Sequence, residues 1–93
     1  ISSKADEIRE SGIEGNATIL NWSLLGKSGG NLEAVEFFEF ELEIDLNNQL
    51  PYQIKHRQLV PYEIYNRFQK GMRVPVKVHP DNPKKVILEW DRG

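Results

Sequence analysis

The sequence predicts a mainly β domain, a five-stranded and partly open barrel with one short helix between the third and fourth strands. Apolar and polar residues alternate along several separate stretches, which is the period-2 pattern of half-buried strands. Turns containing glycine, asparagine or proline separate these stretches. A single segment with helical spacing, beginning at Pro61, interrupts the series after the third stretch. The alternative is a helix that rests on an open, curled antiparallel sheet.

Length and composition restrict the class of protein. A chain of 93 residues forms one hydrophobic core and therefore one domain, which we expect at residues 13–93 after a linker or frayed helical turn at residues 1–12. No apolar run approaches the roughly 20 residues of a membrane-spanning helix. The absence of cysteine excludes disulfides, thiolate catalysis and thiolate metal sites. Because the chain begins at Ile1 rather than methionine, we expect an excised fragment or a processed chain.

The first strand is expected from Ile13 to Leu25, because this stretch is rich in β-branched and apolar residues and lacks proline. Its alternation changes phase near Ile19, which predicts a bulge there. Gly15 suits a barrel corner or a close backbone approach. The glycine-rich segment 26–31 is expected to be a hairpin loop, since a phosphate-binding loop would lead into a helix.

The second strand, residues 33–46, alternates an apolar row with acidic residues. Phe37 and Phe38 belong to opposite phases, so a second bulge is expected between them. The third strand, residues 52–60, would place Lys55 and Arg57 opposite the glutamates if the two strands are antiparallel.

A two-turn helix is expected from Pro61 to Gly71, with Ile64 and Phe68 spaced i, i+4. Two valine-rich strands then follow, one around residues 74–78 and one around residues 86–90, joined by the turn HPDNPKK. Three strands, a helix and two strands is the order of an OB-like barrel.

Charge is distributed unevenly along the chain. Residues 1–50 carry three basic and ten acidic residues, whereas residues 51–93 carry nine basic and four acidic ones. The favoured interpretation is that acidic and basic strands lie side by side and neutralise each other. The alternative is a bipolar surface whose basic face meets an anionic partner.

The sequence offers little catalytic chemistry. Its histidines are His56, on the apolar phase of the third strand and expected to be hydrogen-bonded, and His79, in the last turn. With Asp81, His79 would make an incomplete metal site, and no serine lies in a nucleophile-elbow pattern. We therefore expect a domain that is not an enzyme and takes no cofactor and no metal.

Four segments, GNATIL, FEFELEI, PYQIKHRQLVP and GMRVPVKVHPDNPKKVILEW, resemble bacterial small β-domains of unknown function over residues 13–90. Such domains end in a glycine, a valine strand, a proline-bracketed turn and a final strand. The resemblance implies an architecture and a bacterial, membrane-associated context, but it brings no site residues.

The sequence thus favours an accessory or protein-interaction domain, and the alternative is single-stranded nucleic-acid binding through an OB-like barrel. We expect an unknown protein partner or a second copy, paired through an edge strand, with no membrane insertion of this segment. The expected setting is the cytoplasm or the soluble part of a membrane-associated protein. The candidate binding surface is a rim formed by the loop 27–31, Tyr62, Tyr65 and the turn 79–85. Its candidate binding residues are Lys27, Tyr62, Tyr65, His79, Lys84 and Lys85.

Overall fold

The structure, a computed structural model, describes residues 4–27 and 35–90. The elements are, in chain order, α1 (Lys4–Ser11), β1 (Ile13–Lys27), β2 (Val35–Asp45), β3 (Tyr52–Pro61), α2 (Tyr62–Tyr65), β4 (Arg73–His79) and β5 (Asn82–Leu88). None of the helices in this described part is long and apolar enough to cross a membrane.

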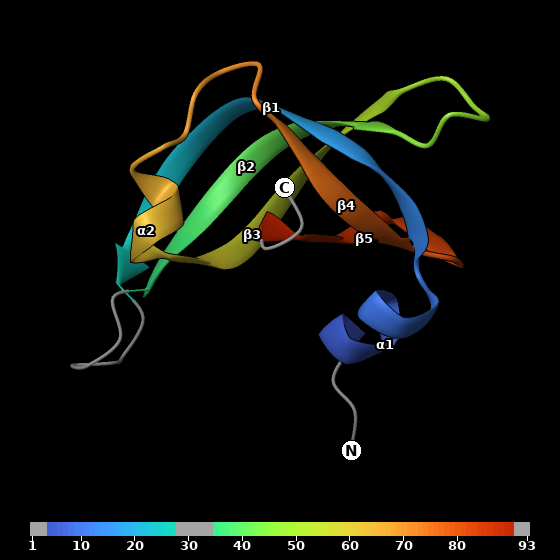
Figure 1. Cartoon of the computed structure of the whole chain (residues 1–93), viewed down its shortest axis with the longest axis horizontal. Coiled ribbons are helices and arrows are strands. Elements are labelled where there is room, and N and C mark those ends of the chain that lie inside the picture. Colours follow the sequence, from blue (N-terminus) through green and yellow to red (C-terminus); the bar gives the residue numbers. More distant parts are fainter. Residues whose placement is uncertain (1–3, 28–34, 91–93) are drawn as a thin grey trace.

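The five strands form one antiparallel sheet in the order β3-β2-β1-β4-β5. The sheet curls until its two edge strands, β3 and β5, contact each other, and α2 follows β3 (Figure 1). No backbone ladder joins these two strands within the described ranges, so the contact between them is a seam. The predicted fold class, a partly open five-stranded barrel with a short helix between the third and fourth strands, is confirmed.

The inward-facing side chains of the strands fill the barrel and form its core. Its fully buried side chains include Phe40, Ile19, Leu42, Ile44, Leu88, Val60, Val76 and Val78. Phe68 closes the end of the barrel near α2, with its ring centroid 5.3–5.5 Å from those of Phe38, Phe40, Trp22 and Trp90. At the other end, the N-terminal segment contributes buried Ile8 of α1.

Two register shifts curve β1 against β2. The first lies between Ile19 and Asn21, where the sequence predicts a bulge, and the second lies between Leu24 and Gly26. The bulge predicted between Phe37 and Phe38 does occur at this point of the β1–β2 ladder, where Leu24 pairs with Phe38 and Gly26 with Phe37. The predicted flip of β2 itself is wrong, because β2 keeps continuous register with β3 and Phe37 belongs to its outer row. The extra residue is therefore in β1, at Leu25, and not in β2.

The helix after β3 is shorter than predicted. It covers one turn, Tyr62–Tyr65, and the chain then turns through i to i+3 hydrogen bonds, such as Arg67 N–H to the Ile64 carbonyl at 3.0 Å. Gly71 adopts a left-handed φ of 86° and donates to the Ile19 carbonyl at 2.8 Å. Ending the helix early lets Phe68 enter the core instead of continuing along a helix face.

The outer row of β2 lies beside the outer row of β3 in the register Glu39 to Arg57 and Glu41 to Lys55. Arg57 Nε lies 3.1 Å from Glu39 Oε2. The interpretation that acidic and basic strands neutralise each other therefore agrees with the observed pairing.

Candidate functional site

The six residues predicted from sequence do not form one rim. Lys27 pairs with Glu36, and Glu36 pairs with Val60 just before α2, so Lys27, Tyr62 and Tyr65 belong to one end of the barrel. The β4–β5 turn lies at the other end of the barrel (Figure 1). There Tyr52 Oη, at the start of β3, donates to the Pro83 carbonyl at 2.8 Å. The loop after Lys27, which was also part of the predicted rim, lies outside the described residues.

Each group has local contacts at its own end. Tyr62 is exposed and its ring lies edge-on to that of Tyr65, 5.2 Å between centroids, while Tyr65 packs on Phe38. In the opposite turn, the Asp81 backbone N–H donates to His79 Nδ1 at 3.0 Å. Lys84 and Lys85 follow on β5. No group of three or more residues able to hold a metal ion occurs among the residues that the structure describes.

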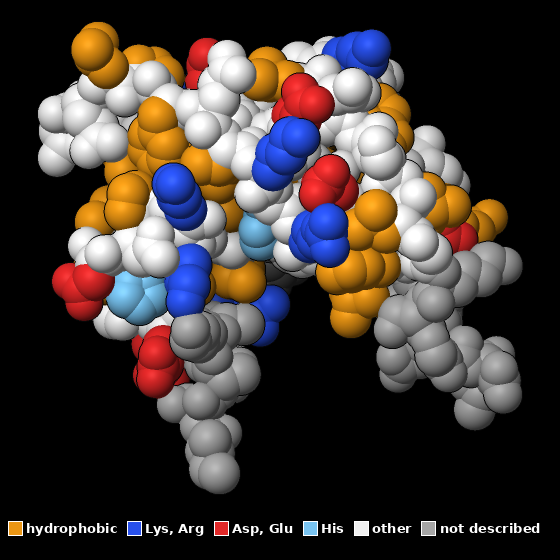
Figure 2. All heavy atoms as spheres, turned by 180° about the vertical axis from the view of Figure 1, so that it is seen from behind, with side chains coloured by type: hydrophobic (Ala, Val, Ile, Leu, Met, Phe, Trp, Pro, Cys, Tyr) orange, Lys and Arg blue, Asp and Glu red, His pale blue; other side chains and the backbone are white. Residues whose placement is uncertain are grey.

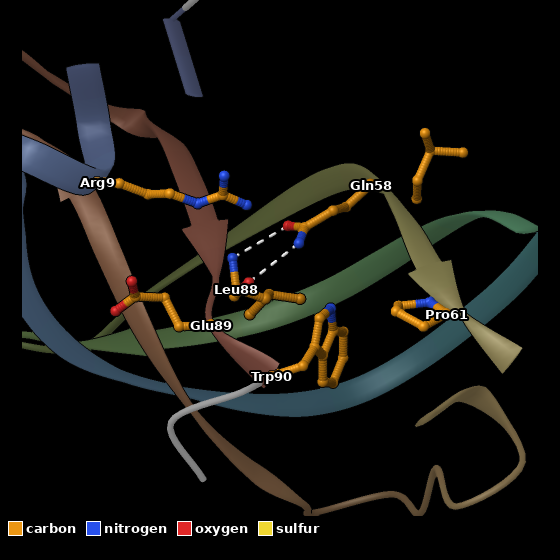
Figure 3. A pocket seen from close by; sticks show the side chains of 7 residues that line it. Arg9, Gln58, Pro61, Leu88, Glu89 and Trp90 are labelled. Atoms are coloured by element: carbon orange, nitrogen blue, oxygen red, sulfur yellow. Dashed lines mark hydrogen bonds between the residues drawn. The ribbon is translucent and has the colours of Figure 1, made fainter. Parts of the chain in front are cut away.

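A hollow of about 420 Å³ opens at the seam, between the end of β3 and the end of β5. It is lined by Arg9, Gln58, Leu59, Pro61, Leu88, Glu89 and Trp90. Figure 3 shows Trp90 and Pro61 on one side of the link between Gln58 and Leu88, and Arg9 and Glu89 on the other. Three separate parts of the chain, α1, β3 and the end of β5, thus meet at one concave surface.

The amide of Gln58 bridges the seam. Its Nε2 donates to the Leu88 carbonyl and its Oε1 accepts from the Leu88 N–H, each at 3.0 Å. A side chain therefore replaces the backbone ladder that would close the barrel at this position. At Gln58 these two hydrogen bonds join β3 to β5, whereas the hollow lies beside them.

His56 supports this bridge. Its Nε2 lies 2.7 Å from Gln58 Oε1, and because that oxygen is an acceptor, His56 must donate. The neutral imidazole therefore carries its proton on Nε2. Burial lowers the pKa of His56, while its hydrogen bond with Gln58 acts in the opposite direction. The expectation that this histidine is hydrogen-bonded and partly buried is confirmed.

Trp90 brings an unpartnered donor to the hollow. Its Nε1 is buried and has no hydrogen-bond partner among the described residues, although its ring packs on Phe40 and Phe68. Leaving a buried donor unpaired costs roughly 1–3 kcal/mol. A carbonyl group that reached this N–H would remove the cost, so a ligand with an acceptor at this point is favoured.

The described lining of the hollow carries no net formal charge, since Arg9 and Glu89 contribute one charge of each sign. Both of these residues have interactions within the protein, so they are not free counter-charges. Leu59 and Pro61 supply an apolar wall. A neutral, partly apolar ligand with hydrogen-bonding groups fits this lining better than a phosphate.

Sequence reasoning missed this site. Gln58 carried the one available signal, because it is a polar residue on the inward phase of β3, as His56 is. Trp90 continues the alternating row of Val86 and Leu88, but that pattern gives no information about its N–H. Arg9 lies in the segment expected to be a linker or a frayed helical turn, so its approach to β5 depends on tertiary packing.

Comparison with known proteins gives no relative: no protein family, curated protein or solved structure matches the chain significantly. The resemblance to bacterial β-domains therefore stays a prediction.

Proposed function

We propose that this barrel is a protein-interaction module that binds an extended segment of a partner polypeptide in the hollow at the β3–β5 seam. The observation that carries the proposal is the buried Nε1–H of Trp90, a residue that lines the hollow and whose N–H has no partner among the described residues. Polypeptide backbone supplies a regular row of carbonyl acceptors, which is the chemistry that this donor lacks.

The neighbouring groups support the same ligand. Because β3 and β5 are the edge strands of the sheet, each has one edge outside any ladder in the described part of the chain. Exposed edges bind extended segments through main-chain hydrogen bonds. Leu59 and Tyr62, which are 46% and 52% exposed, lie along β3 and at the start of α2 and offer apolar contacts for the side chains of such a segment.

The alternative, single-stranded nucleic-acid binding, has less support. Proteins that bind single-stranded nucleic acid combine a continuous positive groove with exposed aromatic rings. Here the β2–β3 face carries glutamates beside its basic residues, and Lys84 and Lys85 near the start of β5 lie at the opposite end from Tyr62 and Tyr65. The residues described as lining the hollow add no net positive charge. We likewise infer that the domain is not an enzyme, because no nucleophile and base converge among the described residues at the seam.

The test is to select binding peptides from a random linear library displayed on phage, and to titrate a selected synthetic peptide into ¹⁵N-labelled protein. We expect saturable shifts of the Trp90 indole N–H and the Gln58 side-chain amide, with the Trp22 indole as an internal reference. Trp90→Phe keeps an aromatic ring and removes the donor, so it should weaken binding about tenfold.

Leu50→Ala is the matched control, since Leu50 is 87% exposed in the β2–β3 turn. It should leave peptide affinity unchanged. The proposal would be contradicted if no peptide were enriched, or if the selected peptides shifted only resonances of the β4–β5 turn. Binding of a fluorescent single-stranded oligonucleotide that weakens steeply with salt would instead support the alternative.

A further inference from the structure

The outer face of the β2–β3 hairpin carries two parallel rows of opposite charge. The row on β2 is acidic, with Glu39, Glu41 and Glu43 in sequence, and the row on β3 contains Lys55 and Arg57. The register places Glu41 directly opposite Lys55 and Glu39 directly opposite Arg57. All of the β3 side chains in this row are exposed, so the charges face outward.

Both rows change to apolar residues at the end near α2. Phe37 is next to Glu39 in the outer row of β2. On β3, the residue opposite Phe37 is Leu59, whose side chain is 46% exposed. On β1, the residue paired with Phe37 is Gly26, which has no side chain to cover the Phe37 ring. Figure 2 shows this arrangement on the back of the molecule, where acidic and basic side chains alternate beside a group of hydrophobic side chains.

We propose that this face binds a second copy of the chain in a symmetric dimer whose two-fold axis runs along the strands, between β2 and β3. Such an axis places β2 of one protomer over β3 of its partner without changing position along the strands. The acidic row of each copy then faces the basic row of the other, and Phe37 of each copy faces Leu59 of the other. The face is therefore complementary to itself, as an isologous interface requires.

The charge pattern selects this orientation. An axis in the same plane but perpendicular to the strands would place β2 over β2 and β3 over β3, so that glutamates face glutamates. Like charges brought together oppose association. Because the outside of a barrel is convex, the contact is limited to these two strands, and we expect a weak dimer with a Kd between about 1 µM and 1 mM.

The decisive experiment uses a charge-swapped chain with Glu39→Arg, Glu41→Lys, Lys55→Glu and Arg57→Glu. The swap keeps opposite charges opposite within each molecule, so it preserves the folded hairpin, and it also preserves complementarity between two swapped copies. Each chain should therefore form its own dimer by sedimentation velocity, while the mixed dimer should be disfavoured because like rows would meet.

The mixed pair is measured by NMR with dilute ¹⁵N-labelled natural chain. Adding unlabelled natural chain should shift the amides of residues 37–41 and 55–59, whereas the same concentration of swapped chain should leave them unchanged. Raising the salt to about 1 M, where the Debye length is roughly 3 Å, should weaken both homodimers. Mixed dimers that form as readily as homodimers would overturn the proposal, and so would a chain that stays monomeric at about 1 mM.

A second variant keeps the test decisive if the swapped chain fails to fold. Leu59→Lys places a charge opposite Phe37 on an exposed position, and it should weaken self-association at least tenfold. Leu50→Lys adds the same charge in the β2–β3 turn and should leave the dimer unchanged. Equal association of the two variants would show that the apolar end of the face is not in the interface.

Discussion

Gln58 and Leu88 pair across the seam as two neighbouring strands would, although only Leu88 contributes its backbone. The side-chain amide of Gln58 both donates to and accepts from Leu88, at 3.0 Å in each direction. The closure of the barrel at this position therefore depends on one primary amide, which is the group best suited to imitate a peptide unit.

Replacing that amide tests its role. In Gln58→Glu, the carboxylate can still accept from the Leu88 N–H but cannot donate to the Leu88 carbonyl, so two acceptors face each other. We expect the free energy of unfolding to fall by about 1–3 kcal/mol in urea denaturation. Gln49→Glu, an exposed substitution in the β2–β3 turn, is the control. An unchanged stability for Gln58→Glu would mean that the seam does not depend on this bridge.

His56 gives the domain a specific dependence on pH. Burial lowers the pKa of His56 below the ordinary value of 6.5, so the folded state disfavours the protonated ring. The stabilising contribution is therefore complete above pH 6.5 and is lost as the pH falls through the lower folded pKa. We expect the free energy of unfolding to decline on acidification by up to about 1.4 kcal/mol per pH unit in this window. Measuring it between about pH 5 and pH 7.5 in His56→Gln should show that slope removed, whereas His79→Gln should retain it.

Phe68 should be the most sensitive aromatic position at the α2 end. Its ring contacts four other aromatic rings and comes from a segment without regular structure, so truncation leaves a cavity that the barrel cannot fill. We expect Phe68→Ala to lower the free energy of unfolding by about 3–5 kcal/mol, and Phe68→Leu to lower it by less. Tyr62→Ala removes an exposed ring nearby and should cost much less. Similar losses for the two alanine variants in urea denaturation would argue against this role.

Gly15 is required by a close approach of two strands. A Cβ added there would lie 2.7 Å from the Asp45 carbonyl oxygen and 2.6 Å from Leu46 Cδ2. Gly15→Ala should therefore lower the free energy of unfolding by about 1–3 kcal/mol. Because the carbonyl is backbone, removing the Leu46 contact should restore only part of the loss, which a double-mutant cycle with Leu46→Ala measures. Complete recovery in the double variant would show that the side chain, and not β2 itself, sets the limit.

The strands could be predicted because β2, β3 and β4 each carry a period-2 pattern, and β1 is rich in β-branched and apolar residues. The acidic row of β2 identified both the strand and its outer face, and Lys55 and Arg57 indicated its neighbour. The bulge after Ile19 was visible because the alternation changes phase there. In contrast, Phe37 was interpreted as a phase change, since an apolar residue on an outer face gives the same signal as a bulge.

The candidate site could not be predicted in the same way. Its residues come from α1, β3 and the end of β5. No local sequence pattern indicates which edge strands come into contact when a sheet curls. The rim predicted from basic and aromatic residues divided into two groups, because Tyr62 and Lys84 belong to opposite ends of the barrel. Composition identifies the groups capable of binding, whereas tertiary closure decides which of them are neighbours.

The pairing of β1 with both β2 and β4 also has a consequence for folding. Three of the four strand pairings are between consecutive strands, whereas the fourth joins Ile13 to Val78 and Thr18 to Arg73, far apart in sequence. Pairings of high sequence separation form slowly, so β1–β4 docking should limit the folding rate. During synthesis on the ribosome, the meander of β1, β2 and β3 emerges first, and the edge of β1 at residues 13–18 has no strand partner until β4 has been made. This segment contains Glu14, Gly15 and Asn16, residues of low strand propensity that discourage pairing with another nascent chain.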